Sequence, residues 1–247
     1  MNSFTAGIIV IGDEILSGRT QDSNSNFIAK KLKEEGIRLE EIIVIQDDKK
    51  TIMQNVLNYS SKYSYVFTTG GIGPTHDDIT AQAVSKAFNR KYEVHKEAFK
   101  ILESYYKQGE FNEGRQKMVW MPQNAKLILN PTSGAPGFNV ENVFCLPGVP
   151  SILKSMIGGL NNVLVGGDPI LSKTLNLRTY ESEIAKSLTE VQNNNNEVEI
   201  GSYPFFRQGK LGVSIVLRSI DKKKIDSCYS QILEFVKAKD IEVVEID

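Results

Sequence analysis

The sequence has few of the residues that build disulfide frameworks or cysteine-based metal sites. Its 247 residues include two cysteines, Cys145 inside an apolar stretch and Cys228 on an expected helix. Two isolated cysteines supply neither a disulfide network nor a metal site. The chain is nevertheless long enough to bury a sizeable apolar core, so we expect ordinary packing to hold the fold together.

An excess of charge of one sign is also missing. The sequence carries 29 Lys and Arg residues against 30 Asp and Glu residues, a formal net charge of -1, and the basic residues are scattered. Proteins that bind nucleic acid concentrate positive charge on one face. We therefore expect no nucleic-acid partner, and the lone tryptophan, Trp120, offers no aromatic platform that would identify a particular base.

Long hydrophobic runs are absent as well. The apolar stretch Gly7–Ile11 ends in Gly12-Asp13-Glu14, far short of the about 20 residues that a membrane span needs and shorter than the apolar region of a signal peptide. We expect a cytoplasmic protein without a membrane partner.

The most informative stretch is Tyr65–Thr80, in which a β-branched and aromatic strand breaks into a glycine-rich turn. A helix with apolar residues at helical spacing is expected to follow. Such a strand–turn–helix unit directs backbone N–H groups and the positive end of a helix at one spot, which suits a phosphate. It lacks the lysine of the P-loop and the third glycine of the dinucleotide fingerprint, so the glycines alone are a weak signal.

Two carboxylates, Asp77 and Asp78, follow the turn. Carboxylates repel a phosphate unless a cation lies between them, and Mg²⁺ is commonly held by one or two carboxylates plus substrate oxygens. The simpler alternative is that one of them caps the expected helix, since aspartate is a preferred N-cap residue. A cap requires only one aspartate, which leaves the second to be explained.

The first part of the chain alternates strands and helices. Ala6–Ile11, Leu39–Ile45 and the stretch from Tyr65 are expected to be strands. The first helix between them is expected to begin at one of Asp22, Ser23 and Asn24 and to end at about Glu35, and the second to begin at Asp47-Asp48. Short alternation of this kind predicts an α/β fold with a parallel sheet. Ligands bind beyond the carboxyl ends of such strands. Four acids lie at those ends: Asp13, Glu14, Asp77 and Asp78.

Further along, two more helices are expected at Lys96–Lys107 and Asn112–Val119, and strands at Lys126–Leu129, Phe138–Val140 and Val143–Leu146. The basic residues Arg115 and Lys117 could reach an anion or could be solvated surface charges. A second strand-to-helix elbow, Leu146-Pro147-Gly148, precedes a helix for which Ser151 is an N-cap candidate.

A different pattern follows the expected linker Val165–Pro169. The order is strand, helix, strand, strand, helix, strand, and the expected bounds are Leu171–Leu177, Glu181–Val191, Val198–Ser202, Leu211–Leu217, Lys222–Lys237 and Ile241–Glu245. This is the order of ferredoxin-like α+β folds. Because the segment has no clustered acids, cysteines or histidines, we expect residues 170–247 to form a small structural or dimerising domain.

Several separate motifs of the first part resemble those of the N-terminal domain of CinA-type proteins, within the molybdopterin-binding superfamily. The matching motifs are Gly12–Gly18, Asp22 with Asn24, Thr68–Thr80, Asn130-Pro131, Ala135–Phe138 and Leu146–Pro150. The resemblance covers residues 4–165 and implies a three-layer α/β sandwich with a mostly parallel sheet over residues 1–165. The tail around Gly201–Pro204 is similar to the region after the same domain in eukaryotic FAD synthases.

The resemblance also implies roles for individual residues. It links Asp78 to metal-dependent chemistry. We expect catalysis from Asp78 and Asp77, and a divalent metal (Mg²⁺, or Mn²⁺ or Co²⁺) at Asp13, Glu14 and Asp78; which acid is the ligand and which the base stays open. The residues expected around a nucleotide substrate are Gly12, Ser17, Asn24, Thr69, Gly70, Gly71, Gly73, Thr75, Lys117, Pro147 and Gly148. The expected assembly is a homo-oligomer, a dimer. The sequence ends before the deamidase region of full-length CinA proteins, so that activity is not implied.

Three functions are compatible with this resemblance. The first is metal-dependent hydrolysis of a nucleotide pyrophosphate such as ADP-ribose or FAD, with release of AMP. The second is binding and adenylylation of molybdopterin in molybdenum cofactor biosynthesis. The third is a binding protein without catalysis. We expect the first, because the motifs match the CinA side of the superfamily most closely and because both glycine elbows and all four acids are present.

Overall fold

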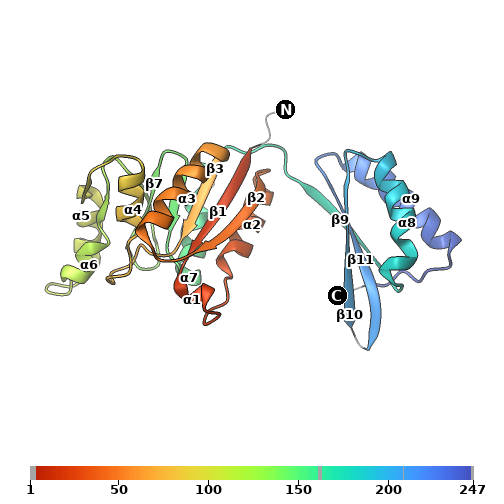
Figure 1. The fold of residues 1–247 in the computed structure, drawn as a ribbon, viewed down its shortest axis with the longest axis horizontal. Helices are drawn as coiled ribbons and strands as arrows, with labels where there is room; N and C mark the ends of the chain where they lie inside the picture. Colours follow the sequence, from red (N-terminus) through yellow and green to blue (C-terminus); the bar gives the residue numbers. More distant parts are fainter. Residues whose placement is uncertain (1–3, 161–162, 208, 246–247) are drawn as a thin grey trace. The chain divides into compact units, whose positions relative to one another are not determined.

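The computed structural model describes residues 4–160, 163–207 and 209–245, and the chain divides into two compact units, residues 1–167 and residues 168–247 (Figure 1). The boundary lies inside the expected linker Val165–Pro169. Each unit has its own buried apolar cluster or clusters, so each can be described separately.

The first unit alternates strands and helices as expected (Figure 1). Its strands are β1 (Thr5–Ile11), β2 (Arg38–Ile45), β3 (Tyr65–Thr69), β4 (Tyr92–Val94), β5 (Trp120–Pro122), β6 (Lys126–Ile128), β7 (Gly137–Val140) and β8 (Val143–Leu146). Its helices are α1 (Asp13–Leu16), α2 (Asn24–Glu34), α3 (Lys49–Lys62), α4 (Thr80–Ala87), α5 (Lys96–Tyr105), α6 (Glu113–Lys117) and α7 (Pro150–Ile157), followed by the 3-10 turn Gly158–Leu160.

Six of these strands form one mostly parallel sheet in the order β2-β1-β3-β8-β7-β6. β1 pairs in parallel with β2 and β3, and β3 pairs in parallel with β8, whereas β7 is antiparallel to both of its neighbours. The chain leaves β1 toward β2 on one side and returns to β3 on the other. The carboxyl ends of β1 and β3 therefore flank a topological switch point, where α/β proteins bind their ligands.

Helices cover both faces of this sheet, which gives three layers. On one face α3 and α4 pack through Ile52, Val56 and Ala83. On the other, α2 and α7 pack through Ile28 and Leu153. Coverage of both faces explains why β1 is apolar without alternation, and the predicted α/β sandwich is confirmed.

A small two-stranded ribbon, β4 with β5, is an element that the sequence analysis missed. Its strands pair antiparallel, with Tyr92 opposite Pro122 and Val94 opposite Trp120. Three-residue strands are too short to produce a recognisable alternation. The ribbon matters here because it brings Trp120 toward the glycine turn.

Two expected helix starts are wrong. Neither Asp77 nor Asp78 caps α4, because the N-cap position is Ile79 and makes no side-chain cap. Ser151 does not cap α7 either, since Val149 holds the N-cap position and Pro150 the first turn. Proline at the first helical position is favourable because its missing N–H would have no helical partner there.

The second unit contains β9 (Leu171–Leu177), α8 (Glu181–Asn194), β10 (Glu199–Arg207), β11 (Lys210–Ser219) and α9 (Lys222–Ala238). Its three strands form an antiparallel sheet, β10-β11-β9, separate from the sheet of the first unit. The expected strand Ile241–Glu245 is wrong as a full strand: the structure has one isolated bridge, Leu177 to Val243. That bridge lies beside β9, the place of the fourth strand in a ferredoxin-like order. Among the residues described, no helix is both long and apolar enough to cross a membrane.

Candidate active site

The turn after β3 can only be built from glycine. Gly70 has a φ of 111°, and a Cβ there would lie 2.1 Å from the carbonyl oxygen of Ile11 at the end of β1. Gly71 has a φ of 69°, and its Cβ would meet the Thr80 hydroxyl at 2.2 Å. Both conformations are costly for residues with a side chain, so the turn is tightly fitted between β1 and α4.

Thr80, the first residue of α4, holds this turn in place. Its hydroxyl donates to Gly70 O at 3.0 Å and its N–H donates to Gly71 O at 2.9 Å, and the residue is fully buried. The sequence places Thr80 in the Thr68–Thr80 motif but does not indicate a role for it. The two hydrogen bonds fix the glycine turn relative to the helix, which is a positioning role.

Asp78 organises the loop between the turn and the helix. Its Oδ2 accepts from the Thr75 N–H at 2.7 Å and from the Thr75 hydroxyl at 2.5 Å. Gly73 lies close by, since a Cβ there would be 2.7 Å from Asp78 Oδ2. Asp78 is therefore held in one orientation by its own loop, independent of any helix cap.

A cavity of about 480 Å³ opens at this edge of the sheet. Eight expected site residues line it: Glu14, Gly70, Gly71, Gly73, Asp77, Asp78, Pro147 and Gly148. Both glycine elbows thus face one space together with three of the four predicted acids. The remaining lining comes from Ile11, Asp47, Pro74, Val149 and Pro150.

Asp47 is a site residue that sequence analysis missed. Its Oδ2 accepts from the Asp13 N–H at 3.0 Å. Burial raises the pKa of Asp47 above its ordinary value, and the negative charges of Asp13, Glu14 and Asp77 raise it further. The signal was available, because Asp47 follows the carboxyl end of β2 just as Asp13 follows β1; it had been read only as the start of a helix.

Asn24 and Thr69 lie in a smaller adjoining cavity of about 50 Å³, which shares Glu14 and Gly148 with the main one. Asn24 is buried, and its Nδ2 donates to Thr69 Oγ1 and to Gly148 O, each at 2.8 Å. The Thr69 hydroxyl donates to Pro147 O at 3.2 Å. These contacts join α2, β3 and the second elbow, so Asn24 and Thr69 fix the position of that elbow relative to β3.

Lys117 lines a third cavity, which shares Gly73 and Asp78 with the main one. Its Nζ donates to Thr75 O. The pKa of Asp77 lies below its ordinary value, chiefly because of the Thr75 side chain and its own backbone N–H, with the charge of Lys117 adding to the effect. Arg115, the other basic candidate, instead lies over the Tyr106 ring at 4.1 Å.

Seven expected site residues do not line the main cavity. Asn24, Thr69 and Lys117 line the two neighbouring cavities, and Thr75 donates to Asp78; the other three are Gly12, Asp13 and Ser17. Ser17 is exposed at the end of α1, where its hydroxyl donates to Glu14 O at 3.3 Å. Gly12 is buried at the end of β1, and Asp13 points its N–H at Asp47. Asp13 therefore contacts the main cavity through Asp47, which lines it, while Gly12 and Ser17 are not part of its lining.

The carboxylates do not form a preformed metal cage. Within residues 4–160, 163–207 and 209–245, no three His, Cys, Asp or Glu side chains are close enough together to hold a metal ion. The pKa of Asp47 is nevertheless raised, first by burial and then by the negative charges of Asp13, Glu14 and Asp77. This arrangement fits a cation held by one or two carboxylates and completed by substrate oxygens.

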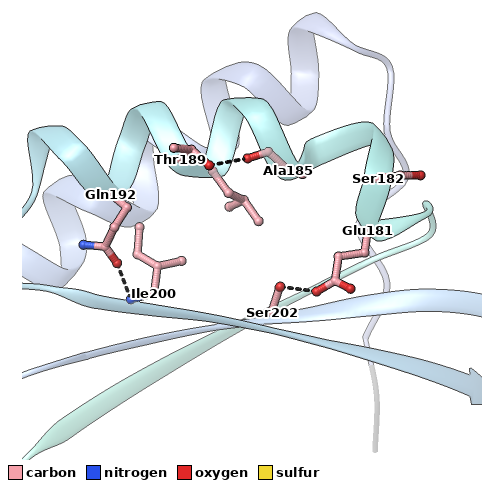
Figure 2. A pocket seen from close by; sticks show the side chains of 8 residues that line it. Glu181, Ser182, Ala185, Thr189, Gln192, Ile200 and Ser202 are labelled. Carbon is pink, nitrogen blue, oxygen red and sulfur yellow. Dashed lines mark hydrogen bonds between the residues drawn. The ribbon is translucent and has the colours of Figure 1, made fainter.

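The second unit has a cavity of its own, about 560 Å³ in volume, between α8 and β10 (Figure 2). Ser202 donates to Glu181 across it, and Gln192 Oε1 accepts from the Ile200 N–H at 2.9 Å (Figure 2). Its lining contains one titratable side chain, Glu181, among Ser182, Ala185, Leu188, Thr189, Gln192, Ile200 and Ser202. This lining therefore has one carboxylate where the main cavity of the first unit has four, and it contains no glycine.

Comparison with known proteins agrees with the geometry of the first unit. Residues 7–165 match the family model described as "Probable molybdopterin binding domain". The chain belongs to this family. Residues 169–245, most of the second unit, match the model described as "FAD synthase, middle domain".

Individual relatives support the same assignment. A solved structure of CinA from Thermoplasma acidophilum, whose function is given as unknown, is 29% identical with a TM-score of 0.62 and covers 66% of this chain and 99% of that one. A Pyrococcus abyssi protein is 37% identical over 97% of this chain and 98% of its own length. A probable FAD synthase of Caenorhabditis elegans is 31% identical over 94% of this chain and 50% of its own length. The resemblance to CinA-type proteins and to FAD synthases is thereby confirmed.

Proposed function

We propose that the chain is a metal-dependent nucleotide pyrophosphatase that cleaves the pyrophosphate of ADP-ribose, FAD or a similar dinucleotide and releases AMP. The observation that carries the proposal is the cavity of about 480 Å³ in which the Gly70–Gly73 turn faces Glu14, Asp47, Asp77 and Asp78. The Gly70 N–H donates to Leu146 O at 3.1 Å, so the Gly71–Gly73 part of the turn is the part that suits phosphate oxygens, and the acids suit proton transfer or cation binding.

The position of each residue in the cavity suggests its role in the reaction. The amides of Gly71–Gly73 would bind and orient the pyrophosphate, since positioning and electrostatics carry most of the catalysis at phosphates. Asp78 is held by Thr75 at the edge of the turn and is our choice for the group that orients or deprotonates the attacking water. A bound Mg²⁺, Mn²⁺ or Co²⁺ would lower the pKa of that water and neutralise the phosphates.

The test is to incubate the full chain with ADP-ribose, FAD or NADH in the presence of Mg²⁺, Mn²⁺ or Co²⁺ and to measure AMP by chromatography. We expect AMP to form only with metal and to stop when a chelator is added. A preparation carrying Asp78→Asn is the control for a contaminating phosphatase. No AMP from any of these dinucleotides would overturn the proposal.

A second candidate function is binding and adenylylation of molybdopterin, which the family match over residues 7–165 favours. An adenylyltransferase must keep water away from the position opposite the leaving phosphate, whereas a hydrolase must admit it. One protein is thus not expected to perform both reactions well. The same preparation offered molybdopterin and ATP distinguishes them: tight pterin binding and adenylylated pterin without AMP release from dinucleotides would favour the second function.

A further inference from the structure

The cavity that contains Lys117 has an aromatic wall. The β4–β5 ribbon places Tyr92 beside Trp120, with ring centroids 5.5 Å apart and planes inclined at 42°. Trp120 is 40% exposed although it lines a cavity together with Gly73 and Asp78. A large aromatic ring that stays partly open next to a polar site has surface available for a ligand.

The surroundings of Trp120 are mostly apolar. Ile72, Met118, Met121, Pro136 and Phe138 complete the wall. The enclosed space is only about 10 Å³, which is too small for a ring to enter. A planar ligand would therefore lie on the exposed part of Trp120 rather than inside the protein.

This wall is continuous with the main cavity, because Gly73 and Asp78 line both. Lys117 lies on the same side, with its Nζ against Thr75 O in the loop after the glycine turn. Phosphate-binding amides, a cation and an exposed aromatic surface thus follow one another along one edge. Phosphate, sugar and base follow one another in the same way in a nucleotide.

We propose that Trp120, backed by Tyr92, stacks the heteroaromatic base of the nucleotide whose phosphates lie at the Gly70–Gly73 turn. The inference rests on the proposed function for the place of the phosphates, and it adds the subsite that binds the base. Stacking on an aromatic side chain tolerates different bases. The subsite would therefore favour nucleotides over inorganic pyrophosphate without selecting one dinucleotide.

The first experiment uses Trp120 as its own reporter, since it is the one tryptophan in the chain. The intrinsic fluorescence of the full chain is titrated with AMP and, separately, with inorganic pyrophosphate, each with Mg²⁺. We expect AMP to quench the emission and pyrophosphate to leave it nearly unchanged. Binding of both ligands is measured in parallel by equilibrium dialysis.

The second experiment compares Trp120→Phe, which keeps a ring, with Trp120→Leu, which removes it. We expect Trp120→Leu to weaken AMP binding by roughly tenfold and Trp120→Phe by less, because stacking depends on the aromatic face. Pyrophosphate binding should stay within about twofold in both variants. Phe206→Leu, at an aromatic side chain of the second unit that is 70% exposed, is the matched control and should leave AMP binding unchanged.

Three outcomes would overturn the inference: AMP that binds without quenching, AMP that binds Trp120→Leu as well as the wild type, and AMP that fails to bind where pyrophosphate does. Each is separate from the proposed function, which is decided by AMP release from dinucleotides. If hydrolysis persists while Trp120→Leu leaves the KM for ADP-ribose unchanged, the reaction assignment stands and the base subsite is wrong.

Discussion

The two units contain cavities of similar size, about 480 Å³ in the first and about 560 Å³ in the second, with very different walls. In the second unit most of the polar groups that line the cavity have partners: Ser202 donates to Glu181, and Gln192 accepts from the Ile200 N–H (Figure 2). In the first unit, burial raises the pKa of Asp47, and the negative charges of Asp13, Glu14 and Asp77 raise it further.

The difference shows that volume alone does not locate a reactive site. A cavity whose polar groups are already paired offers little binding energy to a charged ligand, because new contacts must replace existing ones. A cavity whose carboxylates repel one another gains from a cation, since repulsion becomes attraction. The smaller cavity is for this reason the better candidate for phosphate chemistry.

The largest expected effect is on catalysis by the first unit. Asp78→Asn removes a charge at nearly constant volume, and we expect turnover to fall by roughly a hundredfold or more. The melting temperature should change little, because Ile79 rather than Asp78 holds the N-cap of α4. Activity is followed by AMP release and stability by thermal unfolding.

The matched control is Asp48→Ala. Asp48 is the N-cap of α3 and accepts from the Thr51 N–H at 2.8 Å. Its loss should cost about 0.5–2 kcal/mol of stability and leave turnover intact. If Asp78→Asn behaves like Asp48→Ala, melting early with full activity, the reactive site is not at Asp78.

The contrast between Asp48 and Asp78 also shows how much of the site could be predicted from the sequence. Both precede helices, and propensity alone makes either an N-cap. Alternation of strands and helices was enough to place the acids at one edge of the sheet, because parallel strands end together. The hydrogen-bond partner of Asp78 could not be predicted in this way. It depends on the path of the loop around Gly73 and Thr75, which a sequence pattern does not encode.

Elements that depend on contacts distant in the sequence were missed for a related reason. The β4–β5 ribbon joins Tyr92–Val94 to Trp120–Pro122 across two helices, and neither strand is long enough to show a period. Trp120 was consequently set aside as uninformative. Conversely, Ile241–Glu245 has the composition of a strand but forms a single bridge to β9.

The second prediction concerns the glycine turn. We expect Gly70→Ala to destabilise the protein by about 2–6 kcal/mol, from backbone strain together with the collision with Ile11 O. Gly109→Ala is the control, since Gly109 has a φ of 84° and open space around its Cβ position. Gly109→Ala should lower the free energy of unfolding by about 1–2 kcal/mol, which is the backbone strain without a collision. Equal losses in denaturant unfolding would mean that the turn is not tightly fitted against β1.

The third prediction uses the raised pKa of Asp47. When a carboxyl has a higher pKa in the folded than in the unfolded protein, the free energy of unfolding falls as the pH rises from the unfolded-state pKa to the folded-state pKa. Asp47→Asn should therefore raise the melting temperature at pH 7 by roughly 1–3 °C. The gain should vanish below the ordinary pKa of aspartate, about 3.9. Mg²⁺ should stabilise the wild type more than the variant.

Asp226, in the second unit, is the control of opposite sign. Lys173 donates to its Oδ1 at 2.7 Å and holds its pKa below the ordinary value. Asp226→Asn should lower the melting temperature at pH 7, and this loss should shrink as the pH falls through the folded-state pKa. Mg²⁺ should not distinguish Asp226→Asn from the wild type. A Mg²⁺ effect equal in all three proteins would argue against a cation near Asp47.

The smallest expected effect concerns the second unit, whose proposed role in dimerisation can be sharpened. β10 is an edge strand, and unpaired edges invite pairing with another chain. Gln192 covers part of this edge, because its side chain donates to Val198 O and accepts from the Ile200 N–H, both at 2.9 Å. Pro204, four residues after Ile200 and so facing the same way, has no N–H to offer.

This protected edge should not be the surface through which copies of the chain associate. Gln192→Ala exposes the Val198–Ile200 backbone, and we expect a modest increase in self-association, seen by sedimentation as a larger fraction of higher species at high protein concentration. AMP release by the first unit should stay unchanged. If Gln192→Ala instead dissociates a wild-type dimer, then the α8–β10 side is the dimer interface, because removing a cap would not weaken a contact made elsewhere.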